Sequence, residues 1–211
     1  MSRITPTDVD AYITDLVPPR DPVLAEMEAL AARDRIPIVG PVVGSLLNQV
    51  ATMVGAKRIF ELGSAIGYST VWLARALAPG GKIYYTDGDR RNATLAEGFF
   101  KRAGVLDSVE ILVGDALDSF AKVSGDFDLI FNDVDKEGYP EVYRRAAGRV
   151  RVGGAFITDN VLWSGRVVDA AASDEETEAI RLFNRMLSED KRFRTTVLPL
   201  RDGVALALRL H

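Results

Sequence analysis

The stretch Glu61-Leu62-Gly63-Ser64-Ala65-Ile66-Gly67-Tyr68-Ser69 decides the fold class of this chain, because it joins a short apolar run to a helical pattern. Residues 58–62 have the pattern of a buried strand, and residues 67–78 have the pattern of a helix. Glycines at a strand-to-helix turn allow a ligand to approach the bare backbone. The stretch therefore predicts the first turn of an α/β fold, with a ligand site beside it. The alternative is that Gly63 and Gly67 only serve a tight turn.

Downstream of this turn, apolar runs alternate with helical stretches. The runs cover residues 82–86, 109–113, 127–132 and 155–158, and the helical stretches cover 89–103, 116–123, 139–149 and 174–189. Such alternation predicts a mostly parallel sheet with helices on both faces. Two last runs, 195–200 and 204–210, flank Asp202-Gly203, which favours a hairpin. We expect a seven-stranded Rossmann-like sheet with a C-terminal antiparallel hairpin. This is the layout of class I methyltransferases, not the six parallel strands of a dinucleotide dehydrogenase.

The residues before the first strand predict extra helices. Asp21-Pro22 is typical of an N-cap followed by proline in the first turn. Residues 41–54 place apolar side chains on one helical face, after a rigid connector at 37–41. We expect a single domain over residues 1–211, with an N-terminal helical extension at 1–54 and a ligand-binding α/β core at 55–211.

Composition excludes several kinds of site. The chain has 211 residues, no cysteine, one histidine (His211) and a net charge of −4. Disulfides, thiolate ligands, cysteine nucleophiles and a histidine base inside the fold are therefore excluded, and a general phosphate-binding surface is not expected. The N-terminus lacks a signal-peptide pattern, and no apolar run reaches the ~18 residues of a membrane helix. We expect a cytoplasmic protein that does not enter the membrane.

The ends of the first three strands together predict an adenosyl site. The glycine spacing is G-x-x-x-G, and Glu61 at the mouth of the turn would repel a pyrophosphate. It would suit the ammonium group of S-adenosylmethionine, which has no phosphate. Asp87 ends the second strand, where a carboxylate can accept both ribose hydroxyls. Gly114-Asp115-Ala116 follows the third strand, where an adenine edge would lie.

The fourth and fifth strands end in candidate metal ligands. Asp133 follows one strand and Asp159-Asn160 the next, and the carboxyl ends of strands near the switch point converge. Three oxygen ligands suit Mg²⁺, with Ca²⁺ or Mn²⁺ as alternatives. Such a metal could bind two neighbouring hydroxyls and lower the pKa of one. Lys136 could then take the proton before in-line attack on the sulfonium methyl group.

Each of these residues also has an ordinary interpretation. An aspartate-rich strand end is often a solvated loop or a helix cap. Lys136 taken alone is more often a surface charge than a base, and Asp159-Asn160 taken alone is a common turn pair.

The chain resembles the caffeoyl-CoA and catechol O-methyltransferase family, including its bacterial members. The matching stretches are 61–69 (E-[LI]-G-x-x-x-G-Y-S), 133–136 (D-x-D-K, followed by Tyr139), 159–167 (D-N-x-L-W-x-G-x-V), 183–184 and 198–203. The resemblance implies metal ligands at Asp133, Asp159 and Asn160, with Lys136 as base. It also implies contacts to S-adenosylmethionine from residues at the strand ends, namely Glu61, Gly63, Ser69, Asp87, Asp115, Ala116 and Asp133; the turn argument adds Gly67.

The chain departs from the family at Asn132, where an apolar residue is usual, and at Gly138, where many plant members have asparagine. Residues before Pro37 do not closely match the plant enzymes. Trp163 and Tyr139 are candidates to line the binding site of an aromatic acceptor; the alternative is that they only pack within the fold. The resemblance also implies a homodimer.

The leading functional hypothesis is methyl transfer to a catechol-like small molecule. The alternative is methylation of a hydroxylated wobble uridine in tRNA, which the arginine clusters Arg90-Arg91, Arg144-Arg145 and Arg149-Arg151 could assist by contacting phosphates. A non-catalytic sensor of S-adenosylmethionine is a third reading, disfavoured by the intact metal and base positions.

Overall fold

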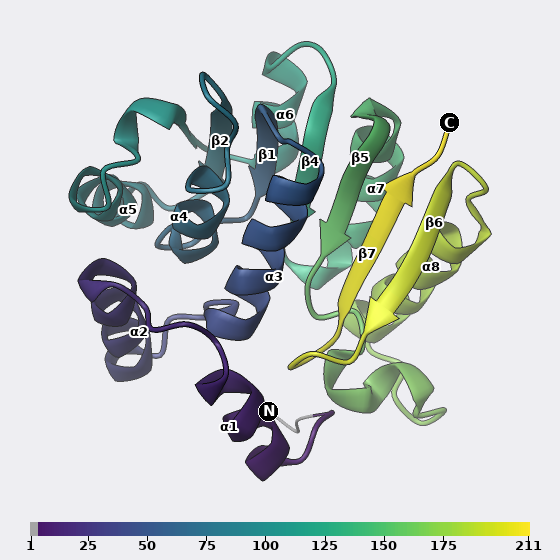
Figure 1. Cartoon of the computed structure of the whole chain (residues 1–211). Coiled ribbons are helices and arrows are strands. Elements are labelled where there is room, and N and C mark those ends of the chain that lie inside the picture. The colour runs from purple at the N-terminus through teal and green to yellow at the C-terminus, as the bar shows by residue number, and fades with distance from the viewer. Residues whose placement is uncertain (1–3) are drawn as a thin grey trace.

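The strands of the computed structural model, which describes residues 4–211, form one seven-stranded sheet in the order β3-β2-β1-β4-β5-β7-β6 (Figure 1). The strands are β1 (Arg58–Leu62), β2 (Lys82–Asp87), β3 (Val109–Val113), β4 (Phe127–Asn132), β5 (Val150–Thr158), β6 (Phe193–Leu198) and β7 (Val204–Arg209). The first five pair in parallel, and β7 is antiparallel to both β5 and β6. The prediction of a class I methyltransferase sheet that ends in an antiparallel hairpin is confirmed.

The strand order reverses between β1 and β4, because the chain first builds β2 and β3 outward and then returns to the other side of β1. Leu62 lies opposite Asn132, and Asn132 lies opposite Thr158. The residues that follow these three positions therefore leave the sheet side by side. In open α/β sheets, this crevice outside the carboxyl ends at the switch point is where ligands bind.

Helices cover both faces of the sheet, as Figure 1 shows. The helices are α1 (Thr7–Asp15), α2 (Pro22–Asp34), α3 (Gly40–Met53), α4 (Tyr68–Ala74), α5 (Arg90–Arg102), α6 (Ala116–Lys122), α7 (Tyr139–Ala146) and α8 (Glu175–Glu189), with short 3₁₀ turns η1 (Leu106–Ser108), η2 (Lys136–Gly138), η3 (Ala147–Arg149) and η4 (Trp163–Val168). Side chains of α2 to α5 pack with one core cluster, and those of α6 to α8 with the other. Alternate residues of β1 serve the two clusters: Ile59 joins the first and Phe60 the second.

Several element boundaries differ from the predictions. β5 begins at Val150, because Val150 pairs with Phe127 before a register shift, whereas the apolar run alone indicated a start at residue 155. The predicted helix at 67–78 ends at Ala74, and the predicted helix at 139–149 changes into the 3₁₀ turn η3 after Ala146. The hairpin connection spans residues 199–203, longer than a two-residue turn.

The N-terminal helices pack against the core and beside the carboxyl ends of the strands. Asp21 caps α2 by accepting hydrogen bonds from the backbone N–H groups of Val23 and Leu24, as predicted. α1 lies below the strand ends in Figure 1, and the hydroxyl of Thr5 donates to the carbonyl of Pro199 at 3.1 Å. The division at residue 54 stays a prediction. In the part of the chain that the structure describes, no helix is long and apolar enough to cross a membrane.

Candidate functional site

The turn after β1 requires both of its glycines. Gly63 and Gly67 have φ angles of +81° and +82°, in the left-handed region that favours glycine. A Cβ at Gly63 would lie 2.5 Å from the carbonyl oxygen of Asp133, and a Cβ at Gly67 would lie 2.5 Å from the ring of Phe100 on α5. The glycines therefore serve the turn and, in addition, allow the loop after β4 and helix α5 to approach it closely.

Glu61 is a buried acid with unused hydrogen-bonding capacity. Its side chain is fully buried, and its Oε2 accepts a hydrogen bond from the hydroxyl of Thr70. Among residues 4–211, no group hydrogen bonds to Oε1. Burial raises the pKa of Glu61 to about 7, and the negative charge of Asp133 adds to this, although nearby hydroxyls oppose it. A buried oxygen of this kind calls for an explanation, and a bound cationic group would supply one.

The other predicted cofactor residues lie at the same edge of the sheet, after β2 and β3. Asp87 accepts hydrogen bonds at Oδ1 from the backbone N–H of Asp89 (2.8 Å) and from Asn92 (3.2 Å). The exposed Asp115 caps α6 by accepting from the backbone N–H of Asp118 at 2.8 Å, and Ala116 is the first residue of that helix. Ser69 is buried in the first turn of α4. Because β1, β2 and β3 are neighbours, these residues lie along one edge of the sheet, where one ligand could contact all of them.

The ends of β4 and β5 bring two acids together. The backbone N–H of Asp133 donates to the carbonyl of Leu62 at 2.8 Å, and that of Asp159 donates to the carbonyl of Asn132 at 3.2 Å, so the ladder continues past both strand ends. Burial raises the pKa of Asp133, against the nearby charge of Lys136. Burial and the charge of Asp133 raise the pKa of Asp159 to about 7. The charge of Asp133 thus opposes ionisation of Asp159, and that of Asp135 opposes ionisation of Asp133, which is a setting that favours a bound cation.

Asn160 follows Asp159 in a left-handed conformation, with a φ of 58°. Its backbone N–H donates to Oδ1 of Asp159 at 2.9 Å, which orients that carboxylate. Within residues 4–211, there is no group of three or more histidine, cysteine, aspartate or glutamate residues placed to hold a metal ion. The predicted set contains two carboxylates and one amide. Its oxygen donors fit a hard divalent cation.

Lys136 lies at this site and not on the outer surface. Its Nζ donates to Oδ1 of Asp133 at 3.1 Å and to the carbonyl of Val134 at 3.2 Å, and 13% of its side chain is exposed. The same atom lies 5.0 Å from the ring centre of Tyr139 and 6.0 Å from that of Trp163. The structure therefore brings the predicted base together with the predicted metal ligands.

Tyr139 and Trp163 play different parts at this site. Tyr139 is fully buried, and its hydroxyl donates to the carbonyl of Asp159 at 2.8 Å. Its ring packs edge-on against Phe183. Tyr139 is thus packing that supports the site, whereas the partly exposed Trp163 remains a candidate to contact an acceptor.

Two residues at the site, Arg201 and Asp202, were missed as site residues by the sequence reasoning, which used them only in the hairpin turn and in the matching stretch 198–203. Asp202 is buried, and one of its carboxylate oxygens accepts the backbone N–H of Ser164. The positive charge of Arg201 lowers the pKa of both Asp133 and Asp159, which partly offsets the effect of burial. A charged Arg-Asp pair at a hairpin tip is a weak signal, because such pairs are common in exposed turns.

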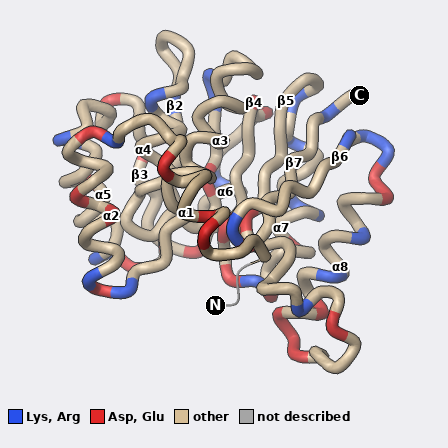
Figure 2. The backbone as a smooth tube through the Cα atoms, turned by 60° about the horizontal axis from the view of Figure 1, so that its bottom comes forward, with Lys and Arg blue, Asp and Glu red and all other residues tan. Residues whose placement is uncertain are grey.

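Over residues 4–211, basic positions are interspersed with acidic ones along the backbone. In Figure 2, lysine and arginine lie among aspartate and glutamate and do not gather on one side. Arg91 pairs with Asp89 and Arg144 pairs with Glu141. Arg149 donates to backbone carbonyls between residues 120 and 125. These interactions occupy arginines in the three clusters that motivated the tRNA alternative, which is therefore not favoured.

Comparisons with known proteins agree with the fold. The sequence pattern of the family described as O-methyltransferase matches residues 19–210. Two proteins named catechol O-methyltransferase, from Niastella koreensis and Mycobacterium tuberculosis, are each 35% identical to this chain; the matches cover 95% and 96% of this chain and 96% of each relative.

Solved structures are similar over nearly the whole chain. The O-methyltransferase from Bacillus cereus in complex with SAH is 33% identical, with a TM-score of 0.87 over 96% of this chain and 97% of that one. TomG from Streptomyces achromogenes, in complex with SAM, is 32% identical, with a TM-score of 0.87 over 97% and 96%. Together with the sheet order and the strand-end motifs, these similarities place the chain in the O-methyltransferase family of S-adenosylmethionine-dependent class I methyltransferases.

Proposed function

We propose that this enzyme transfers a methyl group from S-adenosylmethionine to one hydroxyl of a catechol-like small molecule, with the help of a divalent cation. The observation that carries the proposal is the meeting of Asp133, Asp159 and Lys136 at the carboxyl ends of β4 and β5, beside the glycine turn after β1. Relatives named catechol O-methyltransferase support the acceptor class.

S-adenosylmethionine would lie across the ends of β1, β2 and β3. The buried Oε1 of Glu61 would accept a hydrogen bond from the ammonium group, and Asp87 would accept the ribose hydroxyls. SAM and SAH in the similar solved structures support this ligand. The residues proposed to contact it are those predicted from the sequence, namely Glu61, Gly63, Gly67, Ser69, Asp87, Asp115, Ala116 and Asp133.

Asp133, Asp159 and Asn160 would hold the cation, with Mg²⁺ as the first candidate and Ca²⁺ or Mn²⁺ as alternatives. Their fit rests on the buried Asp159 and the partly buried Asp133, because burial raises the pKa of both and the charge of Asp133 raises that of Asp159 further. A cation bound there would lower the pKa of an acceptor hydroxyl and hold the acceptor in place.

Lys136 would act as the general base. The charge of a cation held beside it would favour its neutral amine form, and the Nζ of that amine would accept the proton as the acceptor O–H bond breaks. The oxygen would then form a bond to the methyl carbon as the carbon–sulfur bond breaks, leaving S-adenosylhomocysteine. Asp133 would hold Lys136 in reach through their 3.1 Å contact, so that both residues belong to the catalytic set. Alignment of oxygen, carbon and sulfur is the enzyme's main contribution to such a transfer.

The test is methyl transfer to 3,4-dihydroxybenzoic acid with Mg²⁺, with chelator, and with chelator followed by excess Mg²⁺. The proposal expects turnover that the chelator abolishes and Mg²⁺ restores, and little turnover of 4-hydroxybenzoic acid. Turnover that is unchanged by chelator would contradict the metal, and equal turnover of both acids would contradict the diol preference. The homodimer and the cytoplasmic location stay predictions, which light scattering and cell fractionation would test.

A further inference from the structure

The segment that joins β5 to α8, residues 160–174, holds an unusual backbone conformation. Trp163 and Ser164 have φ angles of 45° and 54°, and Gly165 follows with 80°. Non-glycine residues are strained in this region and adopt it only where surrounding contacts impose it. Something in the fold must therefore hold this segment.

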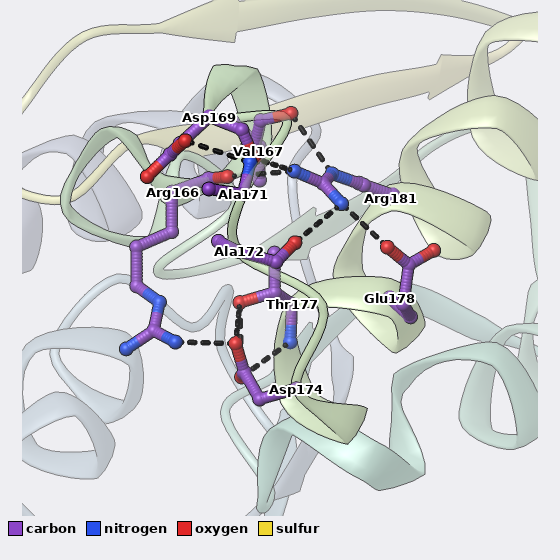
Figure 3. A network of polar contacts seen from close by, with 9 residues as sticks. All are labelled: Arg166, Val167, Asp169, Ala171, Ala172, Asp174, Thr177, Glu178 and Arg181. Carbon is purple, nitrogen blue, oxygen red and sulfur yellow. Dashed lines mark hydrogen bonds and ion pairs between the residues drawn. The ribbon is translucent and has the colours of Figure 1, made fainter.

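Arg181 of α8 holds the second half of the segment (Figure 3). Its Nε donates to the carbonyl of Val167 at 3.0 Å, and its two terminal nitrogens donate to the carbonyls of the three residues Arg166, Asp169 and Ala172 and to the carboxylate of Glu178. An arginine side chain has five N–H donors, and here each can serve a separate interaction. The side chain of Arg181 is 18% exposed; its bonds to Val167 and Ala172 are partly buried, and its other three bonds lie nearer the surface.

The two ends of the segment are held as well. Asn184, one turn beyond Arg181 on the same face of α8, donates to the carbonyl of Val161 at 2.8 Å. Asp202 accepts the backbone N–H of Ser164. At the other end, Asp174 caps α8 through Thr177 and pairs with Arg166, also drawn in Figure 3.

This segment presents Trp163 to the candidate active site. The Trp163 ring centre lies 6.0 Å from Nζ of Lys136, and the indole N–H is buried with no hydrogen-bond partner among residues 4–211. Arg181 binds four carbonyl groups of the segment, and the first of these in the sequence, that of Arg166, is only three residues from Trp163. A shift of the segment would therefore move the indole relative to the base.

We propose that Arg181 is a positioning residue that fixes residues 163–172 as the wall against which the aromatic ring of the acceptor is held. Through this wall it sets acceptor affinity and decides which of two neighbouring hydroxyls faces the methyl donor. This inference rests on the proposed function. Arg181 does not touch the reacting atoms; it acts through the segment that it holds.

The test compares Arg181→Met and Arg181→Lys with Arg185→Met, which removes the same charge from an exposed position one turn along the helix. The readouts on 3,4-dihydroxybenzoic acid are acceptor KM, kcat, the ratio of 3-O-methyl to 4-O-methyl product, the Kd of S-adenosylmethionine, and hydrogen exchange of residues 163–172. Lysine keeps the charge but not the planar fork, so it is expected to restore function only in part.

We expect Arg181→Met to raise acceptor KM about tenfold and to change the product ratio about threefold, because small misplacements of a reactant have large effects. The Kd of S-adenosylmethionine should stay within about twofold of the wild-type value, since most residues proposed to contact this ligand follow β1, β2 and β3 and not β5. In Arg181→Met, the rate of amide hydrogen exchange should rise in residues 163–172 alone. Arg185→Met should match the wild type in all these readouts.

An unchanged product ratio and KM despite faster exchange of the segment would overturn the proposal, as would unchanged exchange. Should the methionine variant fail to fold, Arg181→Lys carries the same comparisons. A wild-type enzyme with no turnover of any catechol would refute the proposed function instead, while the exchange comparison would still test whether Arg181 holds the segment.

Discussion

Replacing Glu61 with glutamine should make stability less dependent on pH. In the folded protein the pKa of Glu61 is raised to about 7 from an ordinary value of 4.5, mainly by burial. The folded state therefore binds this proton more tightly than the unfolded state does. The contribution of Glu61 to stability is fully present below pH 4.5 and is lost as the pH rises through 7. The variant Glu61→Gln cannot ionise and escapes this loss.

The magnitude follows from the two pKa values. At 1.36 kcal/mol per pKa unit, the shift lowers stability by about 3 kcal/mol at pH 8 and by about 1 kcal/mol at pH 5.5, relative to a pH below 4.5. At pH 5.5 this cost is that of keeping Glu61 protonated in the fold while the unfolded chain ionises it. The difference in unfolding free energy between the variant and the wild type should therefore change by about 2 kcal/mol between these pH values. This change does not depend on how well the glutamine amide packs, because that cost is the same at both.

The assay is urea unfolding, followed by circular dichroism without S-adenosylmethionine, at pH 8 and pH 5.5. Glu110→Gln is the matched control, because Glu110 pairs with Lys82 at 3.5 Å and 43% of its side chain is exposed. Its effect should be small and nearly equal at the two pH values. Calorimetric titration should also show that Glu61→Gln binds S-adenosylmethionine about tenfold more weakly, because a charged acceptor is lost. If Glu61→Gln showed no more pH dependence than Glu110→Gln, the raised pKa and the reasoning built on it would be wrong.

Three further variants test other parts of the structure. Gly67→Ala should lower the free energy of unfolding by about 3 kcal/mol, since the alanine would have to adopt a φ of +82° and its Cβ would lie 2.5 Å from the Phe100 ring. A loss under about 1 kcal/mol in urea unfolding would show that the ring moves aside. Asp128→Ala should lower the free energy of unfolding by about 2 kcal/mol at pH 7, because this carboxylate accepts two backbone N–H groups and pairs with Arg151. Since Asp128 lies near the amino end of β4, away from the candidate active site, kcat should stay unchanged. A large fall in kcat of the folded variant would contradict this. Lys136→Met should lower kcat about 100-fold or more while the Kd of S-adenosylmethionine changes less than about twofold. A kcat within about threefold of the wild type would mean that the bound cation suffices without this base.

Much of this architecture was predictable from the sequence, because it depends on local patterns. The apolar runs at β1, β3 and β4 matched the observed strands to the residue, since strands of a parallel sheet covered by helices are mostly apolar runs separated by helical stretches. The strand-end positions of Asp133 and Asp159 were also predictable. In a parallel sheet all carboxyl ends meet at one edge, so a residue's place along its strand already predicts which residues it can join.

Tertiary structure alone decided the contacts between segments that are far apart in the chain. No local pattern indicates that Glu61 keeps an oxygen buried and unpaired, because its surroundings include Thr70 of α4 and the charge of Asp133, which follows β4. Nor does any pattern show that Arg181 would hold the segment around Trp163, or that Asp202 would bind its backbone. A polar residue looks the same in the sequence whether its side chain is exposed to solvent or belongs to a buried hydrogen-bond network. The difference lies in the distance to its partners, which only the fold brings near.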